Sequence, residues 1–377
     1  RHPFASRLPK GTTMRRRLFL TGMAGAAAVI GATGAFRRPS ISANSDVQNS
    51  TGQILICGFD GRDASSRSAQ LLARQIRDGR AGGVIFVKDN IGSKSDVLGL
   101  TALFSDNAPQ KPILAIDHEG GAVQRLVAAH GCTPLPSAKT MAQDYSIDQA
   151  RNLYEEAGHA LARLGFNLNL APVVDLDDPQ NPAVGHFGRA FSTDPQIVTT
   201  YARTLMAGFA AAGILCSLKH FPGQGGARYD PHLALRDDVS SSRSDRDLSP
   251  FRELIRDRSA VMVMSGHLIY EGQPAVLSRT VVTDILRGTL GFEGVALTDD
   301  LDMGLAGYGF ERPSIARKAL KAGNDLFIIR NRRNYDQDLP ASFAAWIAES
   351  LADGDITMDD LKASVARVRN LRKTISI

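Results

Sequence analysis

Eight short apolar runs, separated by stretches with helical periodicity, constrain the fold of this chain more than any other feature. Continuous apolar runs of five or six residues are typical of strands that are buried on both faces of a parallel sheet. The runs lie at 53–58, 83–87, 112–116, 168–174, 213–218, 260–264, 294–298 and 325–329. Helix candidates between them lie at 64–79, 147–164, 196–212, 281–290 and 312–322.

Eight such strands in about 280 residues favour an α/β fold of the (β/α)8 type, a TIM barrel, over an open doubly wound sheet. The first run is followed by Gly58-Phe59-Asp60-Gly61 and not by Gly-x-Gly-x-x-Gly, which argues against a dinucleotide-binding sheet. Residues 341–373 predict two C-terminal helices packed on the barrel. We therefore expect residues 44–377 to form a single domain.

The charge of the chain is concentrated at its beginning. The 377 residues carry a formal net charge of +5, but residues 1–43 hold eight basic residues and no acidic one. The remainder has 36 basic and 39 acidic residues, so the body has no excess of cations with which to bind nucleic acid. The three cysteines show no Cys-x-x-Cys spacing, and Cys57 and Cys216 lie in apolar runs, which predicts buried thiols.

Residues 1–43 have the layout of an export signal. Arg15, Arg16 and Arg17 precede the uncharged segment 18–36, and small residues follow at 40–43, where a peptidase could cut. The arginines followed by a mildly hydrophobic segment resemble a twin-arginine signal, and residues 1–13 are interpreted as an over-extended gene start before Met14. A membrane anchor is the alternative, but the glycines and threonines of 18–36 disfavour stable insertion. We expect an exported protein, periplasmic or extracellular, with no stable membrane span after processing.

Ionisable and polar residues follow five of the eight apolar runs. In a parallel barrel the carboxyl ends of the strands meet at one rim, where active sites are built. The rim segments are Asp117-His118-Glu119-Gly120-Gly121, Asp175, Lys219-His220-Phe221-Pro222-Gly223, Ser265-Gly266-His267 and Thr298-Asp299-Asp300. The pattern predicts an active site that performs acid–base or nucleophilic chemistry on a polar substrate.

A metal-dependent hydrolase is one alternative for this rim. Its ligands would be His118, His220, His232 and His267. Metal-hydrolase barrels of the amidohydrolase type usually carry His-x-His on the first strand, which this chain lacks. We therefore expect no metal and no organic cofactor.

Four motifs, in order along about residues 52 to 335, resemble glycoside hydrolase family 3. They are Asp117-His118-Glu119-Gly120-Gly121-x-Val123-Gln124-Arg125, Lys219-His220-Phe221-Pro222-Gly223, Asp230-x-His232 and Thr298-Asp299-Asp300. Within the family the chain is most similar to the single-domain β-N-acetylhexosaminidases of the muropeptide-recycling type.

The resemblance implies a role for each matching residue. Asp299 matches the catalytic nucleophile, a carboxylate that attacks the anomeric carbon, while Asp300 is expected to point to the other face of the strand and to be structural. Asp230 and His232 match an Asp-x-His dyad that serves as acid and base, for which an imidazole pKa near neutrality is suited. The residues that match positions binding the terminal sugar are Asp117, Arg125, Arg189, Lys219 and His220.

The chain departs from the family pattern in the loop after the fifth run. It has Gly223-Gln224-Gly225-Gly226 where the family commonly has Gly-His-Gly, and Pro231 where Ser is usual. The spacing from Lys219 to His232 is kept, and the glycines predict a loop that can swing to deliver His232.

The resemblance implies a retaining exo-β-N-acetylglucosaminidase that removes terminal GlcNAc from peptidoglycan fragments or chitooligosaccharides. Its expected partner is this carbohydrate substrate, with no nucleic acid, and the chain is expected to be a monomer. A family 3 β-glucosidase is a second hypothesis. It is disfavoured because Asp300 stands where Trp usually follows the nucleophile. A third is an envelope saccharide-binding protein without turnover, which Gln224 and Pro231 keep open.

Overall fold

The structure is a computed structural model, and it describes residues 45–375 with short gaps. The residues outside the description are 1–44, 107, 231–244, 304, 306–310, 333 and 376–377. The predicted export signal, 1–43, and the predicted acid–base residue His232 both lie outside the described residues.

The parallel strands fall into two sheets. One has six strands in the order β13-β1-β2-β3-β6-β7, and the other has three in the order β12-β9-β8. Their bounds are β1 (Leu55–Cys57), β2 (Gly83–Phe86), β3 (Ile113–Ile116), β6 (Leu168–Asn169), β7 (Leu215–Cys216), β8 (Leu218–Phe221), β9 (Met262–Ser265), β12 (Val295–Thr298) and β13 (Phe327–Ile329). Two short antiparallel hairpins are formed by β4 (His118–Gly120) with β5 (Val123–Gln124), and by β10 (Ile269–Tyr270) with β11 (Gln273–Pro274).

Each of the eight predicted runs contains one of these parallel strands, so the predicted parallel α/β fold is confirmed. Two single parallel bridges, Val173↔Lys219 and Leu297↔Leu326, link residues of the six-stranded sheet region to the three-stranded one. The fifth run differs from expectation, because a separate strand, β8, follows β7 and pairs with β9. Lys219 and His220 therefore lie inside a strand, although the sequence placed them after one.

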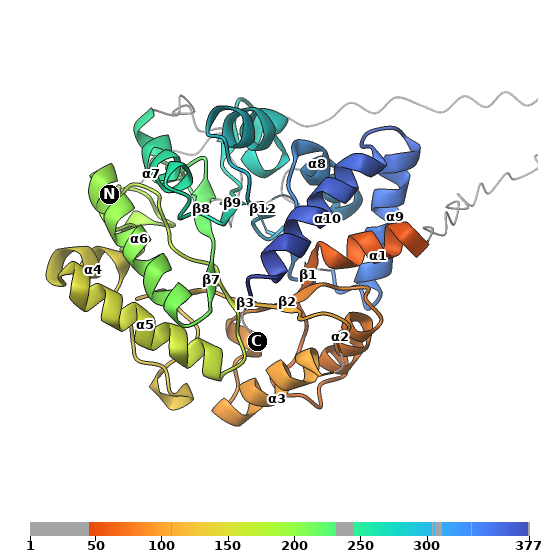
Figure 1. Ribbon diagram of the computed structural model, residues 1–377, viewed down its shortest axis with the longest axis horizontal. Coiled ribbons are helices and arrows are strands. Elements are labelled where there is room, and N and C mark those ends of the chain that lie inside the picture. The colour runs from red at the N-terminus through yellow and green to blue at the C-terminus, as the bar shows by residue number, and fades with distance from the viewer. Residues whose placement is uncertain are drawn as a thin grey trace, which may run out of the picture. The chain divides into compact units, whose positions relative to one another are not determined.

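The helices surround the strands, as Figure 1 shows for α2, α3, α5, α6 and α8. Their bounds are α1 (Ser45–Gln53), α2 (Arg67–Arg77), α3 (Lys94–Ser105), α4 (Ala138–Asp144), α5 (Ile147–Arg163), α6 (Pro195–Ala211), α7 (Asp245–Arg256), α8 (Arg312–Ala322), α9 (Leu339–Ala352) and α10 (Met358–Arg372), with a π-helix at Thr280–Thr289. All five helix candidates and the two C-terminal helices are confirmed.

Side-chain caps explain where several helices begin. At α5, the Ser146 hydroxyl accepts from the Gln149 amide at 3.3 Å, and the Gln149 side chain accepts from the Ser146 amide at 2.8 Å. The pair satisfies two backbone donors that the first helical turn leaves open.

None of the described helices combines the length and apolar character required to cross a bilayer.

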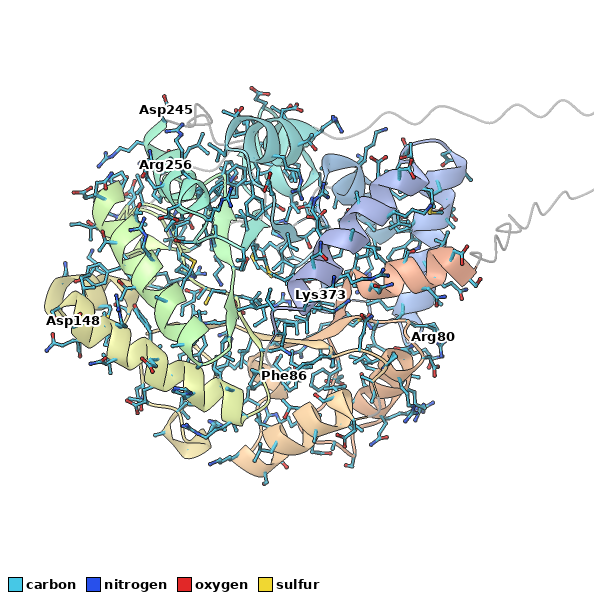
Figure 2. The ribbon with its side chains drawn as sticks, in the orientation of Figure 1. Arg80, Phe86, Asp148, Asp245, Arg256 and Lys373 are labelled. Carbon is cyan, nitrogen blue, oxygen red and sulfur yellow. The ribbon has the colours of Figure 1, made fainter. Side chains whose placement is uncertain are left out.

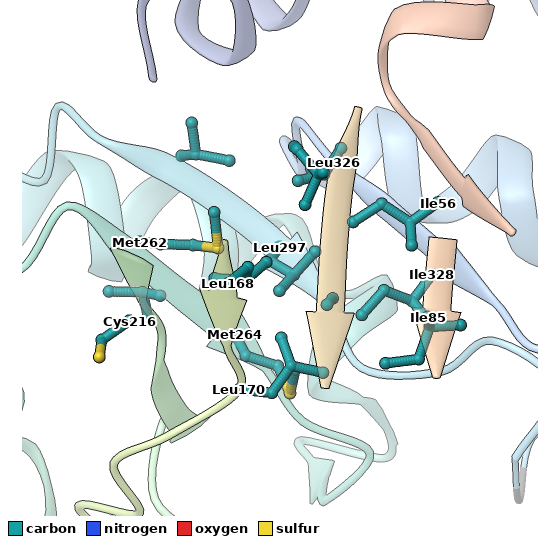
Figure 3. Packing of buried hydrophobic residues seen from close by; sticks show 14 of the residues in the cluster. Ile56, Ile85, Leu168, Leu170, Cys216, Met262, Met264, Leu297, Leu326 and Ile328 are labelled. Atoms are coloured by element: carbon teal, nitrogen blue, oxygen red, sulfur yellow. The ribbon is translucent and has the colours of Figure 1, made fainter. Parts of the chain in front are cut away.

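The buried core lies between the sheets and the helices, with Ile56, Leu168 and Leu297 converging on it in Figure 3. Four phenylalanine rings pack edge to face beside β1 and β2, with centroids 4.9–5.9 Å apart. They are Phe59, Phe86, Phe104 and Phe166. Figure 2 shows Phe86 inside the fold and the charged side chains of Arg80 and Asp148 at its periphery.

The three cysteines are reduced and buried, which confirms the prediction for Cys57 and Cys216. Burial raises the pKa of each thiol, to about 11 for Cys132. These side chains therefore contribute packing as small apolar groups, and their thiolate chemistry is suppressed.

Candidate active site

A cavity of about 420 Å³ lies at the carboxyl ends of the parallel strands. Six of the eight predicted site residues line it: Asp117, Arg125, Arg189, Lys219, His220 and Asp299. A larger cavity of about 750 Å³ lies beside the amino ends of β9 and β12 and contains none of the predicted site residues. The smaller cavity is the candidate site, because the carboxyl ends of the strands carry the ionisable residues.

A network of buried charges forms one wall of this cavity. The Lys219 ammonium on β8 donates to Asp117 at 2.9 Å and lies 2.6 Å from Glu119. Arg189 donates to both oxygens of Glu119 at 2.8 Å and to the Ala183 carbonyl at 2.9 Å. Two carboxylates and two cations from distant parts of the sequence thus hold one another at this wall of the cavity.

The network fixes the protonation of its members. Burial favours the neutral form of Asp117, but the charges of Lys219 and Arg125 outweigh it and hold the pKa of Asp117 below its usual value. Burial is likewise outweighed at Glu119 by Arg189 and Lys219, which lower the pKa of Glu119. The same carboxylates raise the pKa of Lys219 against burial. All four groups therefore stay charged at neutral pH, and Asp117 presents a fixed hydrogen-bond acceptor to the cavity.

Arg125 and Arg189 bind Asp117 and Glu119 to different extents. Arg125 directly follows β5 in the sequence, and its Nη2 lies 3.4 Å from Oδ2 of Asp117. Arg189 donates from Nε and both Nη atoms to protein acceptors. Its main contact is therefore with Glu119, and it has fewer donors to offer a ligand than Arg125 has. The roles predicted for both arginines in sugar binding stay predictions.

His220 is oriented by Asp175, which directly follows the apolar run 168–174 that contains β6. Asp175 Oδ2 lies 2.8 Å from His220 Nδ1, and its Oδ1 accepts from the backbone amide of Gln224 at 2.8 Å. Because a carboxylate accepts the Nδ1 proton, Nε2 remains the acceptor nitrogen of the neutral ring. Gln224, the residue that departs from the family pattern, is buried. The nitrogen of its side-chain amide, Nε2, lies 2.9 Å from the same Nδ1.

Asp299 and Asp300 follow β12 and differ in their surroundings. Asp299 is half-buried and lines the cavity, and its carboxylate accepts from the Asp300 amide at 2.7 Å. Asp300 is buried and accepts from Arg330 twice, from the backbone amide at 2.9 Å and from Nε at 2.5 Å. Burial raises the pKa of Asp300 to about 6, opposed by Arg330 and assisted by Asp302. Of the two carboxylates, Asp299 is the more exposed to the cavity, whereas Asp300 is buried and held by Arg330.

The predicted acid–base dyad is only partly described. Asp230 is half-buried, ends the described segment before 231–244, and is not among the residues that line the cavity. The start of this loop is held by Asn181, whose Nδ2 donates to the carbonyls of Gln224 at 2.6 Å and Gly225 at 2.9 Å. The role of Asp230 and His232 stays a prediction.

Within the described ranges, no three His, Cys, Asp or Glu side chains are grouped closely enough to hold a metal ion. His267 Nε2 lies 2.9 Å from the Asp300 carbonyl, and His220 is engaged by Asp175. His118 is fully buried, and burial, together with the nearby charge of Arg125, lowers its pKa to about 4. These three histidines do not form the ligand set of the metal-hydrolase alternative.

Sequence reasoning did not assign three residues of the cavity region. Glu119 lies in the motif that follows β3, but its pairing with Arg189 joins residues 70 apart and leaves no local signal. Asp175 lies at the predicted rim, but the sequence does not show that its partner is His220. Arg330 directly follows the last apolar run and lines the cavity, so the rule that located the other rim residues could have found it.

A parallel α/β fold with a charged cavity at the carboxyl ends of its strands is the architecture of an enzyme acting on a small polar substrate. The profile of the glycosyl hydrolase family 3 N terminal domain matches residues 47–371. The chain belongs to this family.

Relatives and solved structures agree with this assignment. A β-hexosaminidase of Alkalilimnicola ehrlichii is 36% identical over 290 residues, which cover 74% of this chain and 80% of the relative. A β-hexosaminidase of Pseudomonas aeruginosa is 37% identical over 270 residues, covering 69% and 78%. The crystal structure of a β-N-acetylhexosaminidase from Beutenbergia cavernae superposes with a TM-score of 0.75 at 27% identity, covering 88% of this chain and 99% of that one. A family 3 β-N-acetylglucosaminidase from Paenibacillus sp. gives 0.76 at 30% identity, covering 87% and 62%.

Proposed function

We propose that the protein is a retaining exo-β-N-acetylglucosaminidase that removes terminal, non-reducing GlcNAc from an oligosaccharide. The observation that carries the proposal is a single cavity in which Asp299, Asp117, Lys219 and His220 meet, in a chain whose relatives are named β-hexosaminidases. The size of the cavity, about 420 Å³, suits one sugar ring and part of its neighbour better than a long polymer.

Asp299 is the proposed nucleophile. One of its carboxylate oxygens forms a bond to the anomeric carbon as the bond to the leaving oxygen breaks, and His232 gives its proton to that oxygen. In the second step His232 takes a proton from water, the water oxygen bonds to the anomeric carbon, and the ester to Asp299 breaks. Asp230 would orient the imidazole and favour its charged form. The half-buried position of Asp299 on the cavity supports this assignment over Asp300, which is buried and held by Arg330.

The terminal sugar is proposed to bind against the buried charge network. The ionised Asp117 and Nε2 of His220 would accept hydrogen bonds from sugar hydroxyls, while Lys219, Arg125 and Arg189 would donate to sugar oxygens. Because Lys219 is fixed between two carboxylates, it does not have to be ordered when the sugar binds.

The same proposal includes one closed (β/α)8 barrel. It is supported by the bridges Val173↔Lys219 and Leu297↔Leu326, which supply neighbours for the sheet edges at β8 and β12. Such a barrel would bring Asp117, Lys219 and Asp299 to one rim from strands that lie far apart in sequence.

Export by the twin-arginine route, cleavage of residues 1–43 and a role in peptidoglycan turnover are also proposed. Arg15, Arg16 and Arg17 before an uncharged segment support them. Determining the N-terminal residue of the protein recovered from the culture medium or the periplasm tests this. A mature chain beginning near residue 44 is expected, and a chain that is retained in the cytoplasm with residues 15–17 intact would contradict it.

The test of the activity compares nitrophenol release from the β-N-acetylglucosaminide and the β-glucoside, by the wild type and by Asp299→Asn, with a chelator present. Turnover of the acetamido sugar alone, lost in Asp299→Asn and insensitive to chelator, is expected. Preference for the glucoside would support the β-glucosidase alternative. Binding of the saccharide without any turnover would support the binding-protein alternative.

A further inference from the structure

One side of the cavity carries charges that sugar binding does not explain. Arg330 and Arg332 follow β13, and Lys88 and Asp89 follow β2, and all four line the cavity. β13 and β2 are the two neighbours of β1 in the six-stranded sheet, so these side chains share one sector of the rim. We call these four residues the basic sector.

Arg330 is held in place and still has donors to offer. Its backbone amide and Nε both donate to the buried Asp300 carboxylate, which fixes the plane of the guanidinium. The two Nη nitrogens make no hydrogen bond to any residue in the described ranges, and the side chain is 36% exposed. A guanidinium anchored through Nε presents its paired Nη–H groups as a fork that fits a carboxylate.

The basic sector has an excess of positive charge. Asp89 is paired with Arg332, and Asp300 with Arg330. Lys88 is exposed and forms no ion pair within the described ranges. Burial opposes the charge of Arg330, but the carboxylates of Asp300, Asp299 and Asp117 outweigh it and raise the pKa of Arg330, so the guanidinium stays charged beside the proposed nucleophile.

We propose that Arg330 is a specificity residue that favours substrates carrying a carboxylate on the leaving group, with Lys88 adding to the attraction. The inference rests on the proposed function, because a terminal GlcNAc has no charge and any anion must lie on the part that leaves. A neutral leaving sugar would leave the Nη groups hydrated and lose nothing, whereas an anionic one gains a charge-assisted pair of hydrogen bonds.

The experiment uses two aryl substrates that differ in one charge. One is 4-nitrophenyl β-N-acetylglucosaminide, and the other is its analogue with a carboxylate at position 3 of the nitrophenyl ring. The kcat and KM of both are measured for the wild type, Arg330→Gln, Arg330→Lys and the control Arg317→Gln. Arg317 on α8 pairs with exposed carboxylates of α9 and its C-cap, outside the cavity. Comparing each variant with the wild type cancels the difference in leaving-group chemistry between the substrates.

The ratio of kcat/KM for the carboxylated over the neutral substrate should fall at least about tenfold in Arg330→Gln, mainly through KM. Arg330→Lys should retain part of the ratio, and Arg317→Gln all of it. In the wild type the ratio should also fall as salt is raised, a readout that does not depend on the stability of any variant.

The outcomes separate the two proposals. If both substrates are hydrolysed, and neither Arg330→Gln nor salt changes the ratio, the specificity role is overturned and the glycosidase function stands. If the wild type hydrolyses neither substrate, both proposals fail. If Arg330→Gln loses activity on both substrates, the effect of salt on the wild type and the ratio in Arg330→Lys decide, and an unchanged ratio in both overturns the role.

Discussion

Two sides of one cavity handle charge in different ways. The side of β3 and β8 carries three buried charges, Glu119, Arg189 and Lys219, and the half-buried Asp117. Each of these charges is matched by partners at 2.6–2.9 Å. In the basic sector the pair Arg332–Asp89 is 40% and 58% exposed, and Arg330 keeps free Nη donors. We therefore expect the first side to be rigid and costly to alter, and the second to tolerate change with little loss of stability, which suits it to selecting substrates.

The largest effect is expected at the carboxylate between the two sides. Asp299→Asn should lower kcat/KM by about 10⁴-fold or more, because an amide cannot form the glycosyl ester. The fold should be unaffected, since Asp299 is only half-buried. Steady-state kinetics with 4-nitrophenyl β-N-acetylglucosaminide and the thermal midpoint measure the two effects. Activity within tenfold of the wild type would contradict the assignment.

Glu119→Gln should remove about 3–5 kcal/mol of stability, because it leaves Arg189 without its bidentate partner inside the fold. Urea unfolding at neutral pH measures the loss. The matched control is Asp257→Asn, which removes the partner of the exposed Arg203 and should cost at most about 1 kcal/mol. Equal losses in the two variants would remove the distinction between buried and exposed pairs.

The pH dependence of stability should have opposite signs on the two sides. The lowered pKa of Glu119 and Asp117 gives stability that is present above their ordinary values of 4.5 and 3.8 and is lost as the pH falls below them. The pKa of Asp300, raised from 3.8 to about 6, means that the folded state binds a proton more tightly than the unfolded state. Stability should therefore decline as the pH rises from about 4 to 6, by at most about 3 kcal/mol from this group.

Urea unfolding of the wild type and Asp300→Asn across pH 4–7 tests the contribution of Asp300. The variant has no carboxyl to titrate, so its stability relative to the wild type should increase between pH 4 and 6 and then level off. Parallel curves for the two proteins would show that Asp300 does not titrate in this range.

The smallest effect is expected for Arg332→Gln, which breaks an exposed pair with Asp89. Stability should change by less than about 1 kcal/mol, because water solvates both groups once they are separated. The free energy of unfolding from the same urea titration measures it. A loss as large as that of Glu119→Gln would mean that the basic sector is as rigid as the buried network.

The parts that sequence predicted are those with a local signal. The apolar runs located all eight predicted strands, and periodicity located the helices from 147–164 to 312–322, because burial leaves a repeating pattern in neighbouring residues. The shift of β8 to pair with β9 could not be predicted, since no local pattern tells which strand will be a neighbour.

The site was predictable to the same extent. Asp117, Lys219, His220 and Asp299 follow or lie in apolar runs, and the structure brings them together around one cavity. The pairs Glu119–Arg189, Asp175–His220 and Asp300–Arg330 join residues 30 to 70 positions apart, and such contacts exist only after folding. Arg330 directly follows the last apolar run, so its place at the rim was predictable, but its pairing with Asp300 was not.

The central claim is that Asp299 forms a covalent bond to the sugar. Incubation with a 5-fluoro-N-acetylglucosaminyl fluoride, whose ring fluorine slows breakdown of the glycosyl ester, followed by mass spectrometry of proteolytic fragments, tests it directly. A single sugar adduct on the peptide that contains Thr298-Asp299-Asp300, located on Asp299 and absent in Asp299→Asn, is the predicted result. An adduct on another carboxylate, or turnover of the reagent with inversion and no adduct, would contradict the account.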